Sequence, residues 1–298
     1  MKLKTIIIAA MLSVLICVTG SISVNAVSLY VDGDYTYADI DRDNVALYAY
    51  DGENKILTVP EYFYGRAVSE IYDYAFEENS NIYGLDFSQN GNRLKVINTK
   101  AFNECTELAG DLNLPSSVRT LGFAAFQGCV KLESLTVNYG VVEIPAQCFN
   151  RCSALKTVTL APSVENIGNL AFAKCTSLEK VYLPTSVTYI STSAFNDSPN
   201  VVLNVYTDSY AHQYAKDKNL RYILIDGPKT GDANGDGMVD ILDSTEIQKF
   251  AAEMIELSDE QFELADINND GFVDVIDALL VQKYVVGKYD IPPIIFNS

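Results

Sequence analysis

The sequence predicts an α/β solenoid, in which each repeat is a short strand plus a helical turn, followed by a small all-α module of two loop-helix units. Two observations lead to this prediction. An Ala-Phe pair, once replaced by Cys-Phe, returns at a nearly constant spacing through the middle of the chain. A twelve-residue acidic loop occurs twice near the end. The length of 298 residues allows one large domain and one small one.

Three positions define the repeat because they keep the same spacing. A pair of aliphatic residues three apart precedes each Phe, and in four repeats a Cys follows the Phe by three positions. A period of about 20–29 residues is typical of leucine-rich repeats, which stack because one unit cannot bury its apolar face alone. The Phe positions, which fall at nearly even steps within this range, are Phe76, Phe102, Phe126, Phe149, Phe172 and Phe195.

Each repeat also contains its own strand. Segments such as Leu132-x-x-Leu135-x-Val137 alternate apolar with polar residues, as half-buried strands do. The Ala-Phe-x-x-Cys segment is expected to form a helical turn whose Phe fills the interior. The outward side chains would form a polar ladder on the concave sheet face, which either binds a ligand or only keeps the protein soluble. The ladder comprises Asp86, Asn113, Thr136, Thr159, Tyr182 and Asn204.

The cysteines follow the repeat. Five Cys lie beyond the predicted signal segment, and an odd number cannot all pair within the chain. Free Cys behaves as a small buried hydrophobe, which favours a ladder of buried thiols. Disulfides between neighbouring repeats stay the alternative. The five are Cys105, Cys129, Cys148, Cys152 and Cys175.

The segments Leu183–Ile190 and Ala171–Leu178 resemble the BspA-type leucine-rich repeats of bacterial surface proteins. The resemblance covers roughly residues 45 to 225. It implies opening strands over residues 48–66 and a helical cap at Ser209–Ala215. It also implies adhesion or ligand binding, with an unidentified protein or glycan on the repeat face.

The start of the chain predicts a cleavable signal peptide that ends at Ala26. Lys2 and Lys4 precede an apolar run from Ile6 to Val18, and Val24-Asn25-Ala26 fits a cleavage site. A lipoprotein at Cys17 is less favoured, because the bulky Ile16 precedes it. No later run approaches the ~20 apolar residues of a transmembrane helix, so we expect a secreted protein without a membrane span in its mature form.

Negative charge is concentrated near the end of the chain. The formal charge is −18, which argues against nucleic acid as a partner. From Asp226 onward, 16 Asp and Glu stand against four Lys, a net of −12. Such a concentration indicates either a solvating tail or a cation site, and the motifs within it favour the cation.

Residues 232–243 and 266–277 both fit the twelve-residue calcium loop, with oxygen ligands at positions 1, 3, 5, 9 and 12 and Gly at position 6. Ca²⁺ requires six to eight oxygens, and the acids repel one another without it, so we expect two Ca²⁺ ions whose binding is coupled to folding. The predicted ligands are Asp232, Asn234, Asp236, Met238 (backbone carbonyl), Asp240 and Asp243, then Asp266, Asn268, Asp270, Phe272 (backbone carbonyl), Asp274 and Asp277.

Both loops end in Asp and precede an apolar helical segment, and this duplicated loop-helix resembles the type I dockerins of cellulosome-like systems over roughly residues 230 to 290. Ser258–Gln261 predicts a capping box that opens a short connecting helix. The resemblance implies a cohesin module of a scaffoldin as partner, which would hold the protein at the cell surface.

In dockerins, residues at loop positions ten and eleven and a later pair in the helix determine which partner binds. Both halves of this module have residues that match these positions. Because the halves are nearly identical, the resemblance would permit binding in two orientations. An ordinary core role is the alternative for the aliphatic members. The matching residues are Ile241, Leu242, Lys249 and Phe250, then Val275, Ile276, Lys283 and Tyr284. The predicted segments are a signal peptide (1–26), a repeat domain (27–226), a linker (227–231) and the dockerin-like module (232–298).

No catalytic constellation is visible in the sequence. His212 is the only His, and its place in the predicted cap is interpreted as a surface position. The favoured hypothesis is a non-catalytic binding protein. The alternative is a polysaccharide-degrading hydrolase component of the same complex, with carboxylates such as Asp86 or Asp111 on the repeat face. Regulation of a neighbouring component is a third hypothesis.

Overall fold

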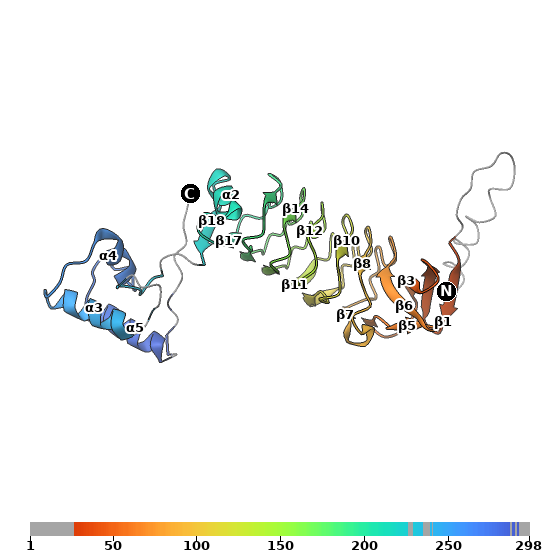
Figure 1. Ribbon diagram of the computed structural model, residues 1–298, viewed down its shortest axis with the longest axis horizontal. Helices are drawn as coiled ribbons and strands as arrows, with labels where there is room; N and C mark the ends of the chain where they lie inside the picture. The colour runs from red at the N-terminus through yellow and green to blue at the C-terminus, as the bar shows by residue number, and fades with distance from the viewer. Residues whose placement is uncertain are drawn as a thin grey trace.

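The computed structural model describes residues 27–225, 229–234, 239, 241–286, 288–289 and 291. The predicted signal peptide, residues 1–26, lies outside this part of the chain. Figure 1 shows a long array of stacked strands, followed by a group of three helices near the C-terminus. The buried apolar residues form two separate clusters, one in each part. The predicted solenoid and helical module are thus confirmed.

One parallel ladder of strands runs along the array, in the order β18-β17-β15-β13-β11-β9. Two further parallel strands, β4 (Ile56–Thr58) and β7 (Gly84–Asp86), pair with each other, and β7 packs against β9. The 3-10 helix η1 (Ser88–Asn90) follows β7. The six strands of the ladder are β9 (Ala109–Asn113), β11 (Lys131–Val137), β13 (Thr157–Leu160), β15 (Lys180–Tyr182), β17 (Val202–Val205) and β18 (Arg221–Leu224).

A second ladder is built from the aliphatic pairs that precede each Phe. Its parallel strands belong to two sheets, with β6 (Arg66–Ile71), β8 (Val96–Ile97) and β10 (Thr120–Leu121) in one, and β12 (Glu143–Ile144), β14 (Asn166–Ile167) and β16 (Tyr189–Ile190) in the other. At the N-terminal end, an antiparallel meander joins β6 through β3, and β5 pairs antiparallel with β6. The added strands are β1 (Leu29–Asp32), β2 (Tyr35–Asp39), β3 (Asn44–Tyr50) and β5 (Tyr62–Phe63).

The Ala-Phe-x-x-Cys segments connect the two ladders. The expected helical turn takes the form of consecutive tight turns in place of α-helix, with residues such as Ala124 (φ 54°) in the left-handed region. The Cys129 N–H donates to the Phe126 carbonyl within the coil (3.3 Å). The Phe126 N–H donates to the Cys148 carbonyl of the next coil (2.9 Å). Some N–H groups of this segment therefore donate to carbonyls of their own coil and others to carbonyls of the next coil. An α-helix does not have this pattern, because its N–H groups donate within the helix.

A continuous stack of phenylalanine rings fills the interior of the array. From Phe76 to Phe195, consecutive rings lie 5.2 to 5.8 Å apart between centroids and within 3° to 16° of parallel. The stack ends at Tyr214 on α2 (Tyr210–Asp217), tilted by 59° to Phe195. Ser209 caps this helix by accepting the His212 N–H. The predicted helical cap is confirmed.

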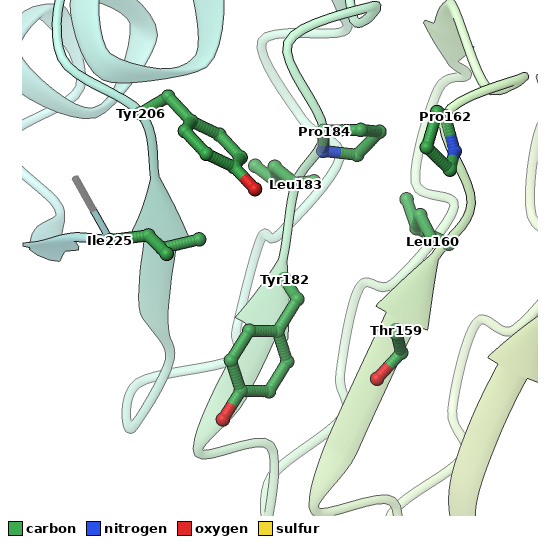
Figure 2. A pocket seen from close by; sticks show the side chains of 8 residues that line it. All are labelled: Thr159, Leu160, Pro162, Tyr182, Leu183, Pro184, Tyr206 and Ile225. Carbon is green, nitrogen blue, oxygen red and sulfur yellow. The ribbon is translucent and has the colours of Figure 1, made fainter.

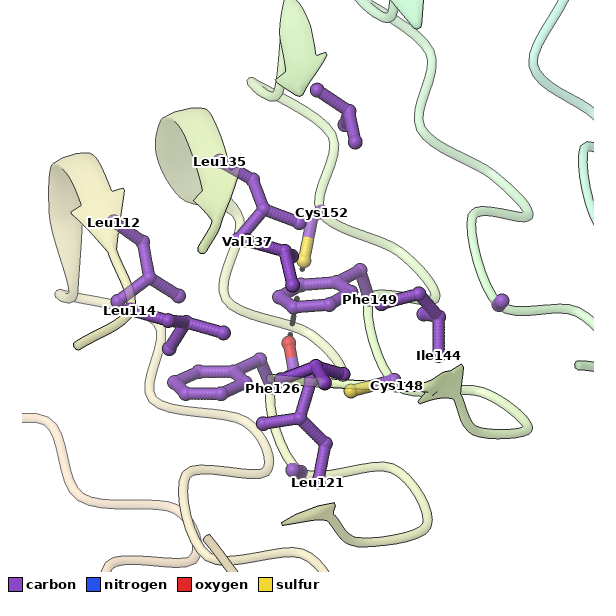
Figure 3. Packing of buried hydrophobic residues seen from close by; sticks show 14 of the residues in the cluster. Leu112, Leu114, Leu121, Phe126, Leu135, Val137, Ile144, Cys148, Phe149 and Cys152 are labelled. Carbon is purple, nitrogen blue, oxygen red and sulfur yellow. Dashed lines mark hydrogen bonds between the residues drawn. The ribbon is translucent and has the colours of Figure 1, made fainter. Parts of the chain in front are cut away.

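The buried thiols run beside the phenylalanine stack as hydrogen-bond donors. The four Cys that follow a Phe by three positions each donate the Sγ–H to the carbonyl of the Phe one repeat earlier, as Figure 3 shows for Cys152 and Phe126 (3.3 Å). The last repeat has Ser198 in this place, which donates to the Phe172 carbonyl (2.8 Å). All five described Cys are free and buried. Burial raises the pKa of Cys105 and of Cys175 to about 12.

The interpretation of His212 as a surface residue is wrong. The side chain is only 5% exposed. Its Nδ1 accepts the Asp208 N–H (3.1 Å), and its ring lies 4.9 Å from that of Tyr222 on β18. The first turn of α2 packs against β18, the last strand of the array, and this contact covers the imidazole. The local sequence pattern does not reveal a contact between segments that lie apart in the sequence.

Three short helices form the C-terminal part: α3 (Ile241–Ala251), α4 (Asp259–Ala265) and α5 (Val275–Val285). α3 packs against α5 around a small core that includes Ile247 and Val281. The capping box predicted at Ser258 and Gln261 is present at the start of α4. Within the described residues, none of the helices is long enough and apolar enough to span a membrane.

Candidate calcium loops and binding faces

The second acidic loop, residues 266–277, wraps its backbone around the carboxylate of its first residue. Asp266 Oδ1 accepts the Asp270 N–H (3.1 Å), and Oδ2 accepts the Gly271 N–H (2.9 Å). Gly271 has φ +88°, and Asn269 also lies in the left-handed region at φ 57°. The turn therefore requires glycine at position six, as the motif predicts. Asn at position four tolerates the same region, a signal that the motif analysis did not use.

Asp277, the last residue of this loop, lies at its base. Its carboxylate accepts the N–H groups of Ile267 (2.9 Å), Asn268 (3.3 Å) and Asp274 (3.0 Å), and the residue is 0% exposed. Among the described residues, no Lys, Arg or His forms an ion pair with it. A buried carboxylate without a cation carries a desolvation penalty, which a bound divalent ion would offset.

The first loop repeats this arrangement where its ends are described. The Asn234 N–H donates to Asp243 Oδ1 (3.1 Å), the counterpart of the bond between Asn268 and Asp277. Asp232 (2% exposed) and Asp243 (0% exposed) are buried as well. Three predicted ligands, Asp236, Met238 and Asp240, lie outside the described residues.

The residues of the second loop fit a hard cation by the chemistry of their donors. The loop offers the carboxylates of Asp266, Asp270 and Asp277, the amide oxygen of Asn268 and the Phe272 carbonyl, all oxygen. The Asp274 carboxylate caps α5 by accepting the Ile276 N–H (2.6 Å). In the described part of the chain, no three His, Cys, Asp or Glu side chains converge into a ready metal cluster. The carboxylates instead accept the loop's own backbone N–H groups.

The predicted partner-binding residues lie in two groups, four at the start of α3 and α5 and four near the ends of these helices. Ile241, Leu242, Val275 and Ile276 are 53%, 57%, 66% and 50% exposed, so the alternative of ordinary core positions is wrong for these four. Lys249, Lys283 and Tyr284 are exposed too. Phe250 differs, because it is partly buried and its ring packs edge-on against Phe262 at 5.9 Å.

The register of the array confirms most of the predicted polar ladder on the sheet face. Asn113, Thr136, Thr159, Tyr182 and Asn204 occupy successive partner positions across neighbouring strands. The expectation that Asn204 faces solvent is wrong, since it is 6% exposed. All of β17 is buried, because β18 and α2 pack against it at the end of the array.

A shallow hollow of about 370 Å³ lies at the C-terminal end of this face. Figure 2 shows Tyr206 and Ile225 on one side, Leu160 and Pro162 on the other, and Leu183 with Pro184 between them. Thr159 and Tyr182 continue the lining. The ladder analysis found only Thr159 and Tyr182, since Leu160 is the last residue of β13 and the other residues come from loops that follow β13, β15, β17 and β18.

Of the two carboxylates considered for hydrolysis, Asp86 lacks the raised pKa of a general acid. Hydrogen bonds from Ser88 and Thr58 hold the pKa of Asp86 below its usual range, whereas a general acid requires a raised pKa. Asp111 accepts the Ser134 hydroxyl (2.5 Å) on the exposed face. Neither carboxylate lines the hollow.

Comparison with known families places both parts of the chain. Residues 69–202 match the BspA type leucine rich repeat region in six copies. Residues 230–286 match the dockerin type I domain, a calcium-binding module. Neither of these is a catalytic module. No curated protein matches the chain.

Three solved leucine-rich repeat proteins are similar to parts of the chain. One from T. pallidum is 29% identical with a TM-score of 0.42, and the match covers 58% of this chain and 69% of that one. One from Eubacterium ventriosum is 20% identical with a TM-score of 0.49, covering 59% and 51%. One from Bacteroides ovatus is 16% identical with a TM-score of 0.30, covering 60% and 66%. On the family matches, the chain is a BspA-type leucine rich repeat array joined to a C-terminal dockerin type I domain.

Proposed function

We propose that the chain is a secreted, non-catalytic binding protein. Its dockerin domain attaches it to a cohesin module of a cell-surface scaffoldin, and its repeat array displays a ligand-binding face. The observation that supports this most directly is the duplicated acidic loop-helix, in which each loop ends beside exposed apolar side chains and each helix carries an exposed lysine in its last turn. Segment boundaries at residues 26, 226 and 231 complete the proposal.

Two Ca²⁺ ions bind in this proposal, one in each loop. Bound calcium supplies positive charge beside Asp277, whose buried carboxylate forms no ion pair with a described Lys, Arg or His. The residues that would hold the ions are the twelve ligands predicted from the sequence. Both loops run directly into a helix, so ordering a loop also fixes the first turn of α3 or α5.

Docking then uses the side chains at the loop ends. Exposed aliphatic residues such as Leu242 and Ile276 contribute apolar area that a partner can bury, about 25 cal/mol per Å². Lys249 and Lys283 are two of four Lys in a segment of net charge −12, and they fit acidic groups on the partner. In this proposal calcium orders the surface, and recognition comes from apolar contacts together with the charges of Lys249 and Lys283.

The attachment is tested by capture of the full mature chain on immobilised cohesins. We expect capture by at least one cohesin in the presence of Ca²⁺ and its loss in EGTA. The matched variants Asp277→Asn and Asp197→Asn each remove one negative charge, the first in the acidic loop and the second in a turn of the array. Only the loop variant should reduce capture. Capture that persists in EGTA, or capture by no cohesin, would contradict the proposal.

The repeat face is tested on glycan and protein arrays. Tyr182→Ala and Tyr206→Ala alter the hollow, and Tyr139→Ala, at an exposed position outside it, serves as control. We expect binding to at least one array component that falls with the first two variants only. Release of reducing sugars from a polysaccharide panel, lost in Asp86→Asn or Asp111→Asn, would instead establish the hydrolase alternative.

A further inference from the structure

The two halves of the dockerin domain present matched stripes of exposed side chains. In each half the stripe contains loop positions ten and eleven, the next residue on the same helix face, the lysine, and the residue three beyond it. All ten residues are exposed. The first stripe is Ile241, Leu242, Thr245, Lys249 and Ala252, and the second stripe is Val275, Ile276, Leu279, Lys283 and Val286.

Beneath the stripes the halves are alike. Asp243 and Asp277 are both 0% exposed, and the aliphatic residues four positions later, Ile247 and Val281, are both 0% exposed. The halves therefore share one scaffold, and they differ in the chemistry that this scaffold presents. Substitutions within the stripes then change recognition with little effect on the core.

The first difference is apolar area. The second stripe exposes Leu279 (47%) and Val286 (64%) where the first has Thr245 and Ala252. The Thr245 hydroxyl is already engaged, because it donates to the Ile241 carbonyl (2.9 Å). A partner that covers the second stripe thus buries more apolar surface than one that covers the first.

The second difference is the state of the lysine. Lys249 forms an ion pair with Glu246 one turn earlier on α3 (Nζ to Oε2 3.1 Å). The residue that corresponds to Glu246 in α5 is Leu280, and Lys283 forms no ion pair with any described residue. Lys283 is therefore available to a partner carboxylate. Glu246, by contrast, competes for Lys249 and repels an acidic partner group.

We infer that the dockerin domain docks mainly in one orientation, through the second stripe, on a cohesin surface that is apolar and carries an acidic group opposite Lys283. This inference rests on the proposed function and deepens it. The near identity of the halves in sequence would permit two orientations, as the dockerin resemblance implies. Two independent differences between the stripes, in apolar area and in charge, both favour the same half.

The test uses calorimetric titration of the full mature chain, in Ca²⁺, with a cohesin that captures it. Charge is tested by the matched pair Lys283→Glu and Lys249→Glu, and apolar contact by Ile276→Ala and Leu242→Ala. We expect each second-stripe variant to weaken binding about tenfold or more, the equivalent of one good contact. Each first-stripe variant should change it less than about threefold.

Two controls keep the outcomes distinct. Calcium uptake and the circular dichroism spectrum of every variant must match those of the unaltered chain, so that a loss reflects docking alone. Equal losses of affinity in both members of each pair, or larger losses in the first stripe, overturn the inference. In that case capture of the unaltered chain still upholds the proposed function. Failure of every cohesin to capture the unaltered chain removes the proposed function and the inference with it.

Discussion

The repeat array and the dockerin domain bury opposite kinds of side chain. The array interior holds stacked phenylalanine rings and protonated thiols, with aliphatic residues around them. The dockerin domain has a small apolar core, and its acidic loops bury three acids almost completely, Asp232, Asp243 and Asp277. Apolar burial stabilises a fold without a metal, whereas a bound cation would offset the desolvation of a buried carboxylate such as that of Asp277, which forms no ion pair with a described residue. The array should therefore fold by itself, and the dockerin domain should depend on calcium.

Calcium removal gives the largest expected contrast between the two parts. In EGTA we expect α3 and α5 to lose protection from hydrogen exchange, while the array strands stay protected. At a Ca²⁺ concentration about 1,000 times the dissociation constant, bound metal stabilises the domain by about 4 kcal/mol per site. Hydrogen exchange with mass spectrometry resolves β13 from α5. Unchanged protection of both helices in EGTA would contradict the dependence.

Truncation of a central ring should damage the array alone. Phe149 is 0% exposed, with Phe126 and Phe172 stacked at 5.4 and 5.6 Å. Phe149→Ala should lower the free energy of unfolding of the array by about 3–5 kcal/mol, through lost burial and a cavity. Phe123→Ala, at a 42% exposed position in the same array, should cost about 1 kcal/mol or less. Chemical denaturation measures both, and calcium affinity should stay unchanged in each.

Two glycines test backbone strain in each part of the molecule. Gly271 (φ +88°) lies in a calcium loop and Gly110 (φ +77°) in the array, and neither has an atom within 4 Å of an added Cβ. Alanine at either position should cost about 1–2 kcal/mol through backbone conformation alone. Only Gly271→Ala should also weaken calcium binding, measured by titration calorimetry. If Gly110→Ala weakened calcium binding equally, the two parts would not be independent.

The fold was predictable where one pattern repeats. The spacing of Phe149 and its equivalents predicted the stacked repeats, because every coil must fill the same position in the interior. The tight turns in place of a helical turn were not predictable. They depend on hydrogen bonds to the next coil, such as Phe126 N–H to the Cys148 carbonyl. The burial of His212 and Asn204 likewise depends on how α2 and β18 close the array.

The calcium loops were predictable for a different reason. Their predicted oxygen donors lie within twelve consecutive residues, so the loops can be recognised from spacing, and Gly271 has the positive φ that the motif needs at position six. The hollow on the repeat face combines Pro162 and Tyr206, which lie almost two repeats apart in the sequence, and no local pattern joins them. The unequal stripes were visible in the residues, but the ion pair of Lys249 with Glu246 required the structure.

At neutral pH the smallest expected effect concerns the thiols, whose contribution to the stability of the array changes only in alkaline solution. Burial raises the pKa of Cys105 and of Cys175 to about 12, from an ordinary value near 9. Between these values the unfolded chain loses thiol protons that the folded array retains. Stability from this source is therefore complete below about pH 9 and falls as the pH rises toward 12.

Serine can replace these two thiols, and its hydroxyl does not ionise in this pH range, so the replacement removes the pH dependence of stability that the thiols cause. Ser198 already donates to the Phe172 carbonyl as Cys175 does to that of Phe149 (3.2 Å). The double variant Cys105→Ser/Cys175→Ser should match the unaltered array within about 2 kcal/mol at pH 7. Its unfolding free energy should fall less steeply between about pH 9 and 11, by about two protons. Parallel pH profiles for the two chains would show that these thiols ionise in the folded array as readily as in the unfolded chain.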